Sequence, residues 1–417
     1  MVLSAAAFTL TIELSVCQSL APGNAFHDNT IRGCSEMSMH YLTLCCIAKE
    51  ETPFLKEWLA YHAQRGVEHF YVYDNMSQTP IRDVLGGFAD GKRATVLRVP
   101  GKSIQLSVYK DCLKNFGAQS RWMGFLDLDE FVFPREDTDI RVFLSEFEAY
   151  GGLAATWWLF NSSGHLKRPD GLVLQNYTEA FAEQNSYHVK CFVNPARTEA
   201  PLSPHHFQHS HGAYCVNEDH VPLSPWRQFT VAEGRRIRIN HYFVRSQQDF
   251  EEKIRRGRAD DAADDRAYDM TMFMSALNKP SRLDTGIFQF VPELAAALER
   301  NKMPAPSPLP DSAHPFETLM DAALAFLDVG QPEKCLACLC YADEEARKKA
   351  DYWTLRSMAA QIAGNVDRAE RFIHEALRLE CAETAYAQWQ RILRAKGKNT
   401  LADGVAQMMQ GDPAIFL

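Results

Sequence analysis

The sequence predicts an α/β domain with a mostly parallel sheet, followed by an all-α region of helical repeats. Between residues 41 and 126, apolar runs of strand length alternate with segments of helical periodicity, as in βαβ units. The last of these strands runs into a cluster of carboxylates, and the carboxyl edge is where open α/β sheets bind ligands. Beyond residue 315, similar residues recur at an offset of 34 positions, a period typical of stacked helix pairs.

The first half of the chain contains four expected strands separated by three expected helices. The strands are expected at residues 41–48, 68–73, 94–99 and 122–126, and the helices at 54–65, 80–85 and 104–116. Pro53 precedes the first helix and Gly66 follows it, as these residues favour. Parallel strands need helical crossovers, so this order predicts a doubly wound sheet.

Residues 150–245 predict a mixed, loop-rich half suited to forming a cleft over the first. We therefore place a catalytic domain at residues 39–300, a proline-rich linker at 301–315 and a helical region at 316–417. Residues 1–38 form an extension of unknown role. The extension lacks a basic start and carries Glu13 in its apolar stretch, so it makes a poor signal peptide and a poor membrane span. A signal-anchor is the alternative.

Composition narrows the class of protein. The net charge of −9, from 44 basic and 53 acidic residues, disfavours a nucleic-acid partner. Eleven cysteines are scattered through the chain, several in apolar runs, which is typical of buried, reduced thiols. We expect a cytoplasmic protein, either free or peripheral to a membrane.

The helical region shows an internal repeat. Residues 330–335 align with residues 364–369, each segment opening on a glycine, and a third unit is expected near Gly397. This period resembles that of tetratricopeptide repeats, which would offer a surface for a protein partner; the alternative is an unrelated helical bundle. Two clear repeats fall below the usual minimum for a free solenoid, so we expect the region to pack on the catalytic domain.

The carboxylate cluster at the end of the fourth strand is the main chemical signal. The apolar run 122–126 leads directly into Asp127, Asp129 and Glu130. Buried carboxylates are costly unless they are paired, hydrated or bound to a cation, which favours a divalent metal that holds a phosphorylated substrate. The alternative is a strand-end turn with capping aspartates. Asp137 and Asp139 repeat the spacing in a polar stretch, and there we predict a solvated turn.

Four segments, taken together, carry a family resemblance. They are residues 44–50, 73–77, 125–131 and 239–257, with the core Asp-Leu-Asp-Glu-Phe and the tail His-Tyr…Ser…Phe…Lys…Arg-Gly. In this combination the chain resembles GT-A glycosyltransferases of the family 92 and family 2-like groups, from residue 41 to about residue 265. The resemblance implies a nucleotide-sugar donor, a manganese or magnesium cofactor, and a glycan or glycolipid acceptor.

The same resemblance implies roles for individual residues around the metal. Asp129 would be the direct ligand, while Asp127 would hold the ribose or bind the metal through water. His241, at the end of a later apolar strand, is the preferred third ligand, and His211 is the second choice.

Donor binding is expected at three further places. Asp74 follows the second strand, where the family binds the nucleoside; a helix-cap or turn role is the alternative. Lys49 and Glu50 follow the first strand. Lys253 and Arg256 are three residues apart, so they share a helix face that could clamp the diphosphate or lie in solvent.

Acceptor binding and catalysis draw on two other segments. Trp157 and Trp158 precede small polar residues and suit a sugar subsite, although strand alternation would bury one of them in the core. An inverting transfer needs a carboxylate base, for which Asp219 and Glu218 are the candidates. The Gln-x-x-Arg-Trp motif of processive synthases is absent, which favours single-sugar transfer.

Two other functions remain as alternatives. A sugar nucleotidyltransferase also uses a metal at a sheet edge, but the segment 48–53 lacks the glycine-rich loop that would hold a triphosphate. A scaffold protein could act through its repeats and keep only a vestigial sugar-nucleotide domain.

Overall fold

The structure of the protein is a computed structural model that describes residues 39–86, 88, 93–184, 188–210, 212–223, 232–257, 268–304, 316–340, 342 and 345–409. All of these residues belong to one compact unit. The predicted N-terminal extension, most of the predicted linker and His211 lie outside the described residues.

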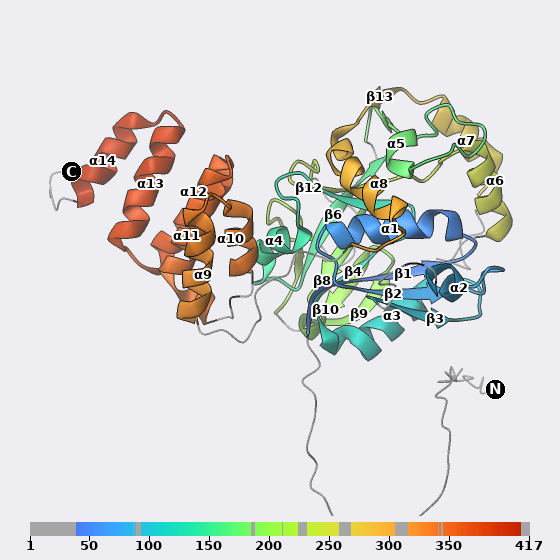
Figure 1. The fold of residues 1–417 in the computed structure, drawn as a ribbon, viewed down its shortest axis with the longest axis horizontal. Coiled ribbons are helices and arrows are strands. Elements are labelled where there is room, and N and C mark those ends of the chain that lie inside the picture. The colour runs from blue at the N-terminus through green and yellow to red at the C-terminus, as the bar shows by residue number, and fades with distance from the viewer. Residues whose placement is uncertain are drawn as a thin grey trace, which may run out of the picture. The chain divides into compact units, whose positions relative to one another are not determined.

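A nine-stranded sheet forms the centre of the catalytic region (Figure 1). Its strands are β1 (His40–Ala48), β2 (His69–Asp74), β3 (Ala94–Arg98), β4 (Ser120–Phe125), β5 (Glu130–Pro134), β6 (Gly152–Leu159), β8 (Val189–Val193), β11 (Cys215–Val216) and β12 (Ile237–His241). The order is β3-β2-β1-β4-β8-β6-β12-β5, and β11 pairs with β6. The first four neighbours are parallel, β8 is antiparallel to β4 and β6, and β5 is antiparallel to β12. The predicted, mostly parallel α/β sheet is confirmed.

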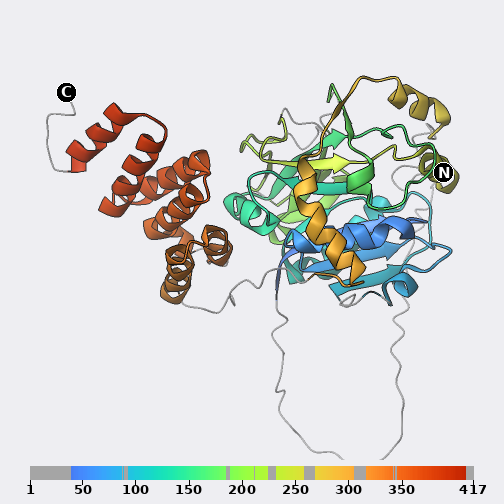
Figure 2. The same ribbon diagram turned by 45° about the horizontal axis from the view of Figure 1, so that its top comes forward.

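Helices cover both faces of the sheet. Helices α1 (Thr52–Gln64) and α8 (Val291–Glu299) lie side by side on one face (Figures 1 and 2). Helix α3 (Gln105–Phe116) covers the other face, together with the hairpin of β9 (Thr198–Ser203) and β10 (His206–His209). The smaller elements are α2 (Ile81–Gly86), α4 (Ile140–Leu144), α5 (Val173–Asn176), β7 (Glu179–Phe181), α6 (Gln247–Arg256), α7 (Met270–Leu277) and β13 (Ser281–Leu283).

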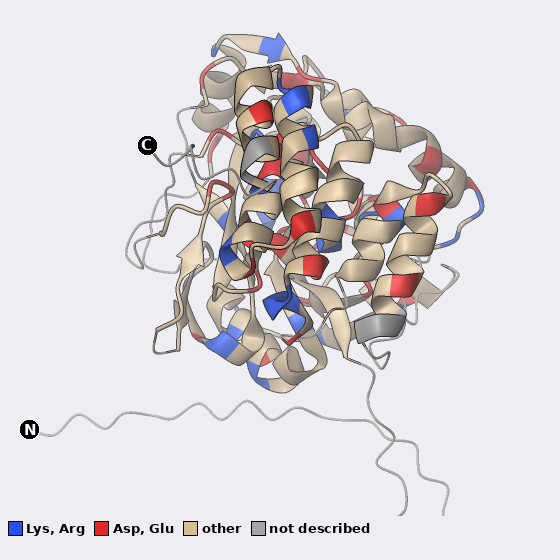
Figure 3. Cartoon of the chain, turned by 90° about the vertical axis from the view of Figure 1, so that its left-hand side faces the viewer, with Lys and Arg blue, Asp and Glu red and all other residues tan. Residues whose placement is uncertain are grey.

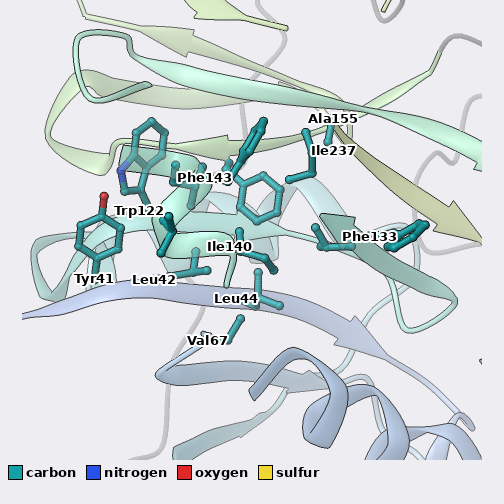
Figure 4. Close-up of a cluster of buried hydrophobic side chains, with 14 of the residues drawn as sticks. Tyr41, Leu42, Leu44, Val67, Trp122, Phe133, Ile140, Phe143, Ala155 and Ile237 are labelled. Carbon is teal, nitrogen blue, oxygen red and sulfur yellow. The ribbon is translucent and has the colours of Figure 1, made fainter. Parts of the chain in front are cut away.

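The core joins residues that are distant in sequence. Figure 4 shows Leu42 and Leu44 of β1, Ile140 and Phe143 of α4, and Ile237 of β12 pointing toward one another. All five are fully buried. Because apolar burial contributes about 25 cal/mol per Å² removed from water, this cluster fixes the strand positions that carry the site.

Among the described residues after 315, six α-helices form three consecutive pairs. They are α9 (Phe316–Asp328), α10 (Pro332–Leu339), α11 (Ala350–Ile362), α12 (Val366–Leu379), α13 (Glu383–Ala395) and α14 (Asn399–Met409). Gly330, Gly364 and Gly397 end the first helix of each pair with positive φ angles of 71°, 83° and 72°, a conformation that glycine adopts without a Cβ penalty. The helical region is confirmed, and its tetratricopeptide character stays a prediction.

The helical region packs against the catalytic region through buried charges. Arg368 of α12 pairs with Asp137 and, at 2.7 Å, with Glu146, while Arg356 of α11 donates to Ser145 Oγ at 2.5 Å. The Asp137 side chain is only 9% exposed, so the predicted solvated turn at Asp137 was wrong. Figure 3 shows basic and acidic residues interspersed over the helices that face the viewer. Among the described residues, no helix is long and apolar enough to cross a membrane.

Glu57 of α1 gives a prediction for stability against pH. Its buried carboxylate accepts the N–H groups of Val173 at 2.8 Å and Leu174 at 3.1 Å, and burial raises its pKa to about 7. The folded state therefore holds a proton that the unfolded state releases near its ordinary pKa of 4.5. The stability from this group is full below pH 4.5 and is lost as the pH rises through 7.

We expect wild type to lose about 3 kcal/mol relative to Glu57→Gln between pH 4.5 and pH 8. Urea unfolding of both proteins at the two pH values measures this difference. Parallel pH dependence of the two proteins would contradict the assignment.

Candidate functional site

The carboxyl edge of the sheet brings the predicted metal residues together. Asp127 and Asp129 follow β4, and His241 ends β12. Strands β4, β6 and β12 run in the same direction, and His241 pairs in register with Glu130 and with Leu159 at the end of β6. The structure therefore places these side chains at one edge, where open α/β sheets bind ligands.

Asp129 lies between two basic side chains. Its carboxylate is 2.8 Å from Lys253 Nζ and 3.4 Å from His241 Nε2, and its side chain is 7% exposed. Burial opposes ionisation, but Lys253 and then His241 outweigh it and hold the pKa of Asp129 well below its usual range. Asp129 is therefore a carboxylate in the folded protein at neutral pH.

Asp127 is held by residues of two neighbouring elements. Its Oδ2 is 2.8 Å from Lys190 Nζ of β8, and its Oδ1 accepts from Gln105 Nε2 of α3 at 2.7 Å. Lys190 is fully buried and also lies 3.6 Å from Glu130 Oε2. Burial would lower the pKa of Lys190, but Asp127 and Glu130 raise it well above its usual value. Burial raises the pKa of Glu130 well above its usual range in spite of Lys190, so the close ion pair of this ammonium is the one with Asp127.

The basic face of α6 lies at the site and not in solvent. Arg256 Nη1 is 3.0 Å from Glu51 Oε1 and donates to the Lys49 carbonyl at 3.2 Å. The Arg245 guanidinium is 3.7 Å from the same glutamate. A small pocket at this point is lined by Glu50, Phe54, Asp129, Phe243, Val244, Arg245, Asp249, Glu252, Lys253 and Arg256. The predicted diphosphate clamp and the loop after β1 are therefore neighbours.

Asp74 has a structural role in the turn after β2. It is buried, and its carboxylate accepts the N–H groups of Ser77 at 2.8 Å and Ile81 at 3.3 Å. Both hydrogen bonds are those of a turn and helix cap, which the sequence offered as the alternative to nucleoside binding. Contact with a nucleoside stays a prediction, and the oxygens of Asp74 already have backbone partners.

The two tryptophans of β6 point to different surroundings, as strand alternation requires. The Trp157 ring centroid is 4.2 Å from that of His241, with the rings of His188 and His205 also adjacent. Trp158 instead stacks on the guanidinium groups of Arg238 and Arg282. Only Trp157 lies beside the carboxyl-edge site.

The structure separates the proposed catalytic bases from this site. Both oxygens of Glu218 accept backbone N–H groups at the start of β12, from residues 235, 236 and 237, at 2.8–2.9 Å. Because His241 is at the other end of β12, roughly 13 Å of strand lies between them. Glu218 is therefore a buried residue that orders a loop. Asp219 is exposed beside it, so neither residue lies with Asp129.

Comparison with known proteins decides the family. A sequence model described as glycosyltransferase family 92 matches residues 40–263, which is more than half of the chain. The chain belongs to glycosyltransferase family 92. This matches the resemblance found in the sequence, and the matched region contains every site residue named above.

The curated relatives are similar over the same region. A family 92 protein of Oryza sativa subsp. japonica is 29% identical over 222 residues, which cover 52% of this chain and 35% of the relative. A family 92 protein of Ricinus communis is 27% identical over 212 residues, covering 48% and 38%. Galactan beta-1,4-galactosyltransferase GALS1 of Arabidopsis thaliana is 28% identical over 103 residues, covering 22% and 21%. The chain thus matches little more than a third of the length of its family 92 relatives.

The family 92 site can be tested for its fit to a divalent metal. Within the described ranges, no group of three or more His, Cys, Asp or Glu side chains is arranged to hold one. Asp129 and His241 do come together, and His241 Nδ1 is buried without a hydrogen-bond partner. Mg²⁺ and similar hard cations bind through one or two carboxylates and keep waters and substrate phosphates as further ligands. The residues fit an ion of this kind.

Sequence reasoning missed Lys190, Gln105 and Arg245 in this family 92 domain. Lys190 carried a usable signal, because it interrupts the apolar strand Val189–Val193 and a lysine there must have a buried acidic partner. Gln105 and Arg245 lie in polar segments, where nothing distinguishes them from surface residues.

Lys190→Met should lower kcat/KM for sugar transfer by at least about tenfold, because Asp127 loses the ammonium that positions it. Loss of one partner from a buried charge pair should also destabilise the fold by about 3–5 kcal/mol. Adding Asp127→Asn, which removes the carboxylate left without its ammonium, should recover part of that stability without recovering activity. The control is Lys279→Met, an exposed lysine away from the site. Full activity of the Lys190 variant would exclude the positioning role.

Proposed function

We propose that this chain is a glycosyltransferase that moves a sugar from a nucleotide-diphosphate donor, a UDP-sugar, to a glycan or glycolipid acceptor. Membership of family 92 supports the reaction class. The observation that carries the proposal is the ionised Asp129, held between Lys253 and His241 at the carboxyl edge of the sheet. The acidic group at this edge can bind a cation and the basic groups can bind phosphate oxygens. Together they suit a substrate with a negatively charged diphosphate and a bound cation.

The basic residues supply the binding energy for the diphosphate. Lys253 and Arg256 project from one face of α6 toward the loop after β1, and Arg245 precedes that helix. Guanidinium groups bind phosphate oxygens through paired, charge-assisted hydrogen bonds. When bound, a manganese or magnesium ion would act as a Lewis acid that stabilises the charge of the departing nucleotide diphosphate. Asp129 and His241 would hold it, with Asp127 positioned by Lys190.

Trp157 is the proposed contact for the transferred sugar or the acceptor. Its half-buried ring lies beside His241 and His188, so it presents an aromatic face near the cation site. Sugar rings pack their C–H faces on such surfaces. We propose a single-sugar transfer, supported by the absence of the processive Gln-x-x-Arg-Trp motif. Inversion stays a prediction of the resemblance, because the structure separates Glu218 and Asp219 from this site.

The first test is nucleotide binding by thermal shift. UDP, GDP and CMP are added with manganese, and again with EDTA. UDP with manganese should give the largest rise in Tm, because a ligand at 100 times its Kd stabilises the native state by about 2.7 kcal/mol. EDTA should remove most of the rise. If none of the nucleotides raises the Tm under either condition, the proposal fails.

The second test is transfer itself. UDP-galactose leads the panel of donors because the name of one relative specifies a galactosyltransferase. Donor hydrolysis is measured without acceptor, and transfer is measured with neutral and acidic oligosaccharides. His241→Ala should raise the manganese concentration needed for half-maximal activity. An unchanged manganese dependence would remove His241 from the cation site.

A further inference from the structure

A large cavity lies between the helical region and the catalytic region, away from the carboxyl edge. Its volume is about 950 Å³, at the upper end of the range for small-ligand sites. The catalytic wall includes Ser120 at the start of β4 and Asn194 just after β8. The helical wall comes from the segment around Arg347 and from α11 and α12.

The cavity and the carboxyl-edge site lie at opposite ends of β4. Ser120 begins this strand and Asp127 follows its end. A strand rises about 3.3 Å per residue, so roughly 20 Å separates the two. A ligand in the cavity therefore does not occupy the donor site.

Basic side chains predominate in the cavity walls. The basic lining residues are Arg121, Arg197, Arg347, Lys348, Arg371 and Arg378. The acidic lining residues are Glu146, Glu148 and Glu375. This excess of positive charge stands out in a chain of net charge −9, and it favours an anionic ligand.

The acidic residues are already shared among several donors. Glu148 pairs with Arg121 at 2.9 Å and with Arg347 at 3.2 Å, and it also accepts from Tyr41 Oη at 2.6 Å. Glu146 pairs with both Arg236 and Arg368. Glu146 and Glu148 are thus each committed to at least two cations, whereas Glu375 pairs with Arg378 at 2.9 Å. The shared carboxylates leave donor capacity in the walls.

Arg347 shows this unused capacity directly. Its side chain is 10% exposed, and its Nη atoms bind Glu148 and the Cys340 carbonyl. Its Nε is buried and has no hydrogen-bond partner. A buried, unsatisfied donor costs about 1–3 kcal/mol, which a bound acceptor atom would remove.

Aromatic rings complete the lining. Tyr150 comes from the catalytic region, and Trp353 and Phe372 come from α11 and α12. Rings beside guanidinium groups offer both a face for sugar C–H groups and donors for carboxylate or phosphate oxygens. A half-open space of this volume between two walls admits a short segment of a chain molecule.

We propose that this cavity binds an anionic segment of the acceptor glycan, at a distance from the point of transfer. The inference rests on the proposed glycosyltransferase function, because a glycan is the acceptor class of such an enzyme. Binding here would hold a long, charged acceptor while another part of it reaches the carboxyl edge.

Isothermal titration calorimetry on the full chain tests the proposal without any transfer reaction. The probes are tetragalacturonate and a sulfated tetrasaccharide, with fully methyl-esterified tetragalacturonate as the neutral control. At least one anionic probe should bind, and the neutral form should bind at least tenfold more weakly. High salt should weaken the anionic complex because exposed charges are screened.

Matched variants locate the binding. Lys348 and Arg378 are 61% and 67% exposed, so Lys348→Glu with Arg378→Glu should weaken the anionic probe at least tenfold without unfolding the protein. Arg394→Glu is the control, because Arg394 is 56% exposed on the same helical region and pairs with Asp403 outside the cavity. Asp129→Asn should bind the probe like wild type.

Several results would overturn the proposal. These are no binding of either anionic probe, equal binding of the neutral form, and equal effects of the cavity and control variants. Equal or tighter binding of hexaglutamate would assign the cavity to an acidic peptide and reject the glycan. Failure of the nucleotide thermal shift would instead reject the proposed function, so the two failures are distinguishable.

Discussion

Replacement of Asp129 by asparagine should lower kcat/KM for sugar transfer by about 10²- to 10³-fold. The neutral amide is a weaker ligand for a hard cation than a carboxylate and forms no ion pair with Lys253. Loss of one such electrostatic contact typically costs 10²- to 10³-fold in rate. Transfer and manganese-dependent UDP binding should fall together. Turnover assays and calorimetry measure the two effects on the same protein.

A stability control separates catalysis from folding. Asp129→Asn leaves the Lys253 ammonium, whose side chain is 12% exposed, without its ion-pair partner. Breaking a buried pair of this kind lowers the free energy of unfolding by about 3–5 kcal/mol. Adding Lys253→Met removes the unpaired charge, so the double variant should regain Tm but stay inactive. If the double variant recovered activity together with Tm, the loss of activity in Asp129→Asn would be due to unfolding.

Arg368→Met should destabilise the protein by about 3–5 kcal/mol and loosen the helical region from the catalytic region. The side chain is 1% exposed, pairs with Asp137 and Glu146, and donates to the Val142 carbonyl at 3.3 Å. Its removal leaves Asp137 in a place where burial already raises the pKa of the carboxyl group. Thermal unfolding should show a lower first transition, and proteolysis should release the helical region more readily.

Arg371 on the same helix is the matched control. It pairs with Glu136 at 3.2 Å, but its side chain is 37% exposed. Exposed ion pairs contribute about 0–1 kcal/mol, so Arg371→Met should have a small effect. Similar losses in the two variants would mean that burial of Arg368 does not determine the attachment.

Much of the fold could be predicted because its signals are local. The strand at residues 41–48 and the helix at 104–116 agree with β1 and α3 to within about one residue. The 34-residue offset also corresponds to the observed spacing, since α9 and α11 start at Phe316 and Ala350. Periodicity and glycine placement are properties of neighbouring residues, and the sequence displays them directly.

The site was predictable where one element supplies the pattern. Asp127 and Asp129 are visible as carboxylates after an apolar strand, and Lys253 and Arg256 as a basic helix face. Lys190 belongs to β8, which lies between β4 and β6 and is antiparallel to both. No pattern in the sequence predicts this position of β8 in the sheet. Its pairing with Asp127 spans 63 positions and depends entirely on the sheet order.

Errors arose where distant segments decide burial. Asp137 lies in a polar stretch and would be solvated in an isolated domain, but α12 covers it from 231 positions away. The sequence around Glu218 predicts a free carboxylate, but in the structure it accepts three backbone N–H groups at the start of β12. The composition of a segment does not predict a partner that comes from a distant part of the chain.

The burial of Arg368 also has a consequence for biosynthesis. The ribosome adds about 5–20 residues per second, so Asp137 emerges roughly 10–50 s before the arginine that neutralises it. During that interval the nascent catalytic region carries an uncovered acidic patch, which Arg236 covers only in part. The catalytic region therefore reaches its full stability only after α12 has been translated. A ribosome that terminates early, after the catalytic region but before α12, would release a catalytic region whose Asp137 and Glu146 lack this arginine.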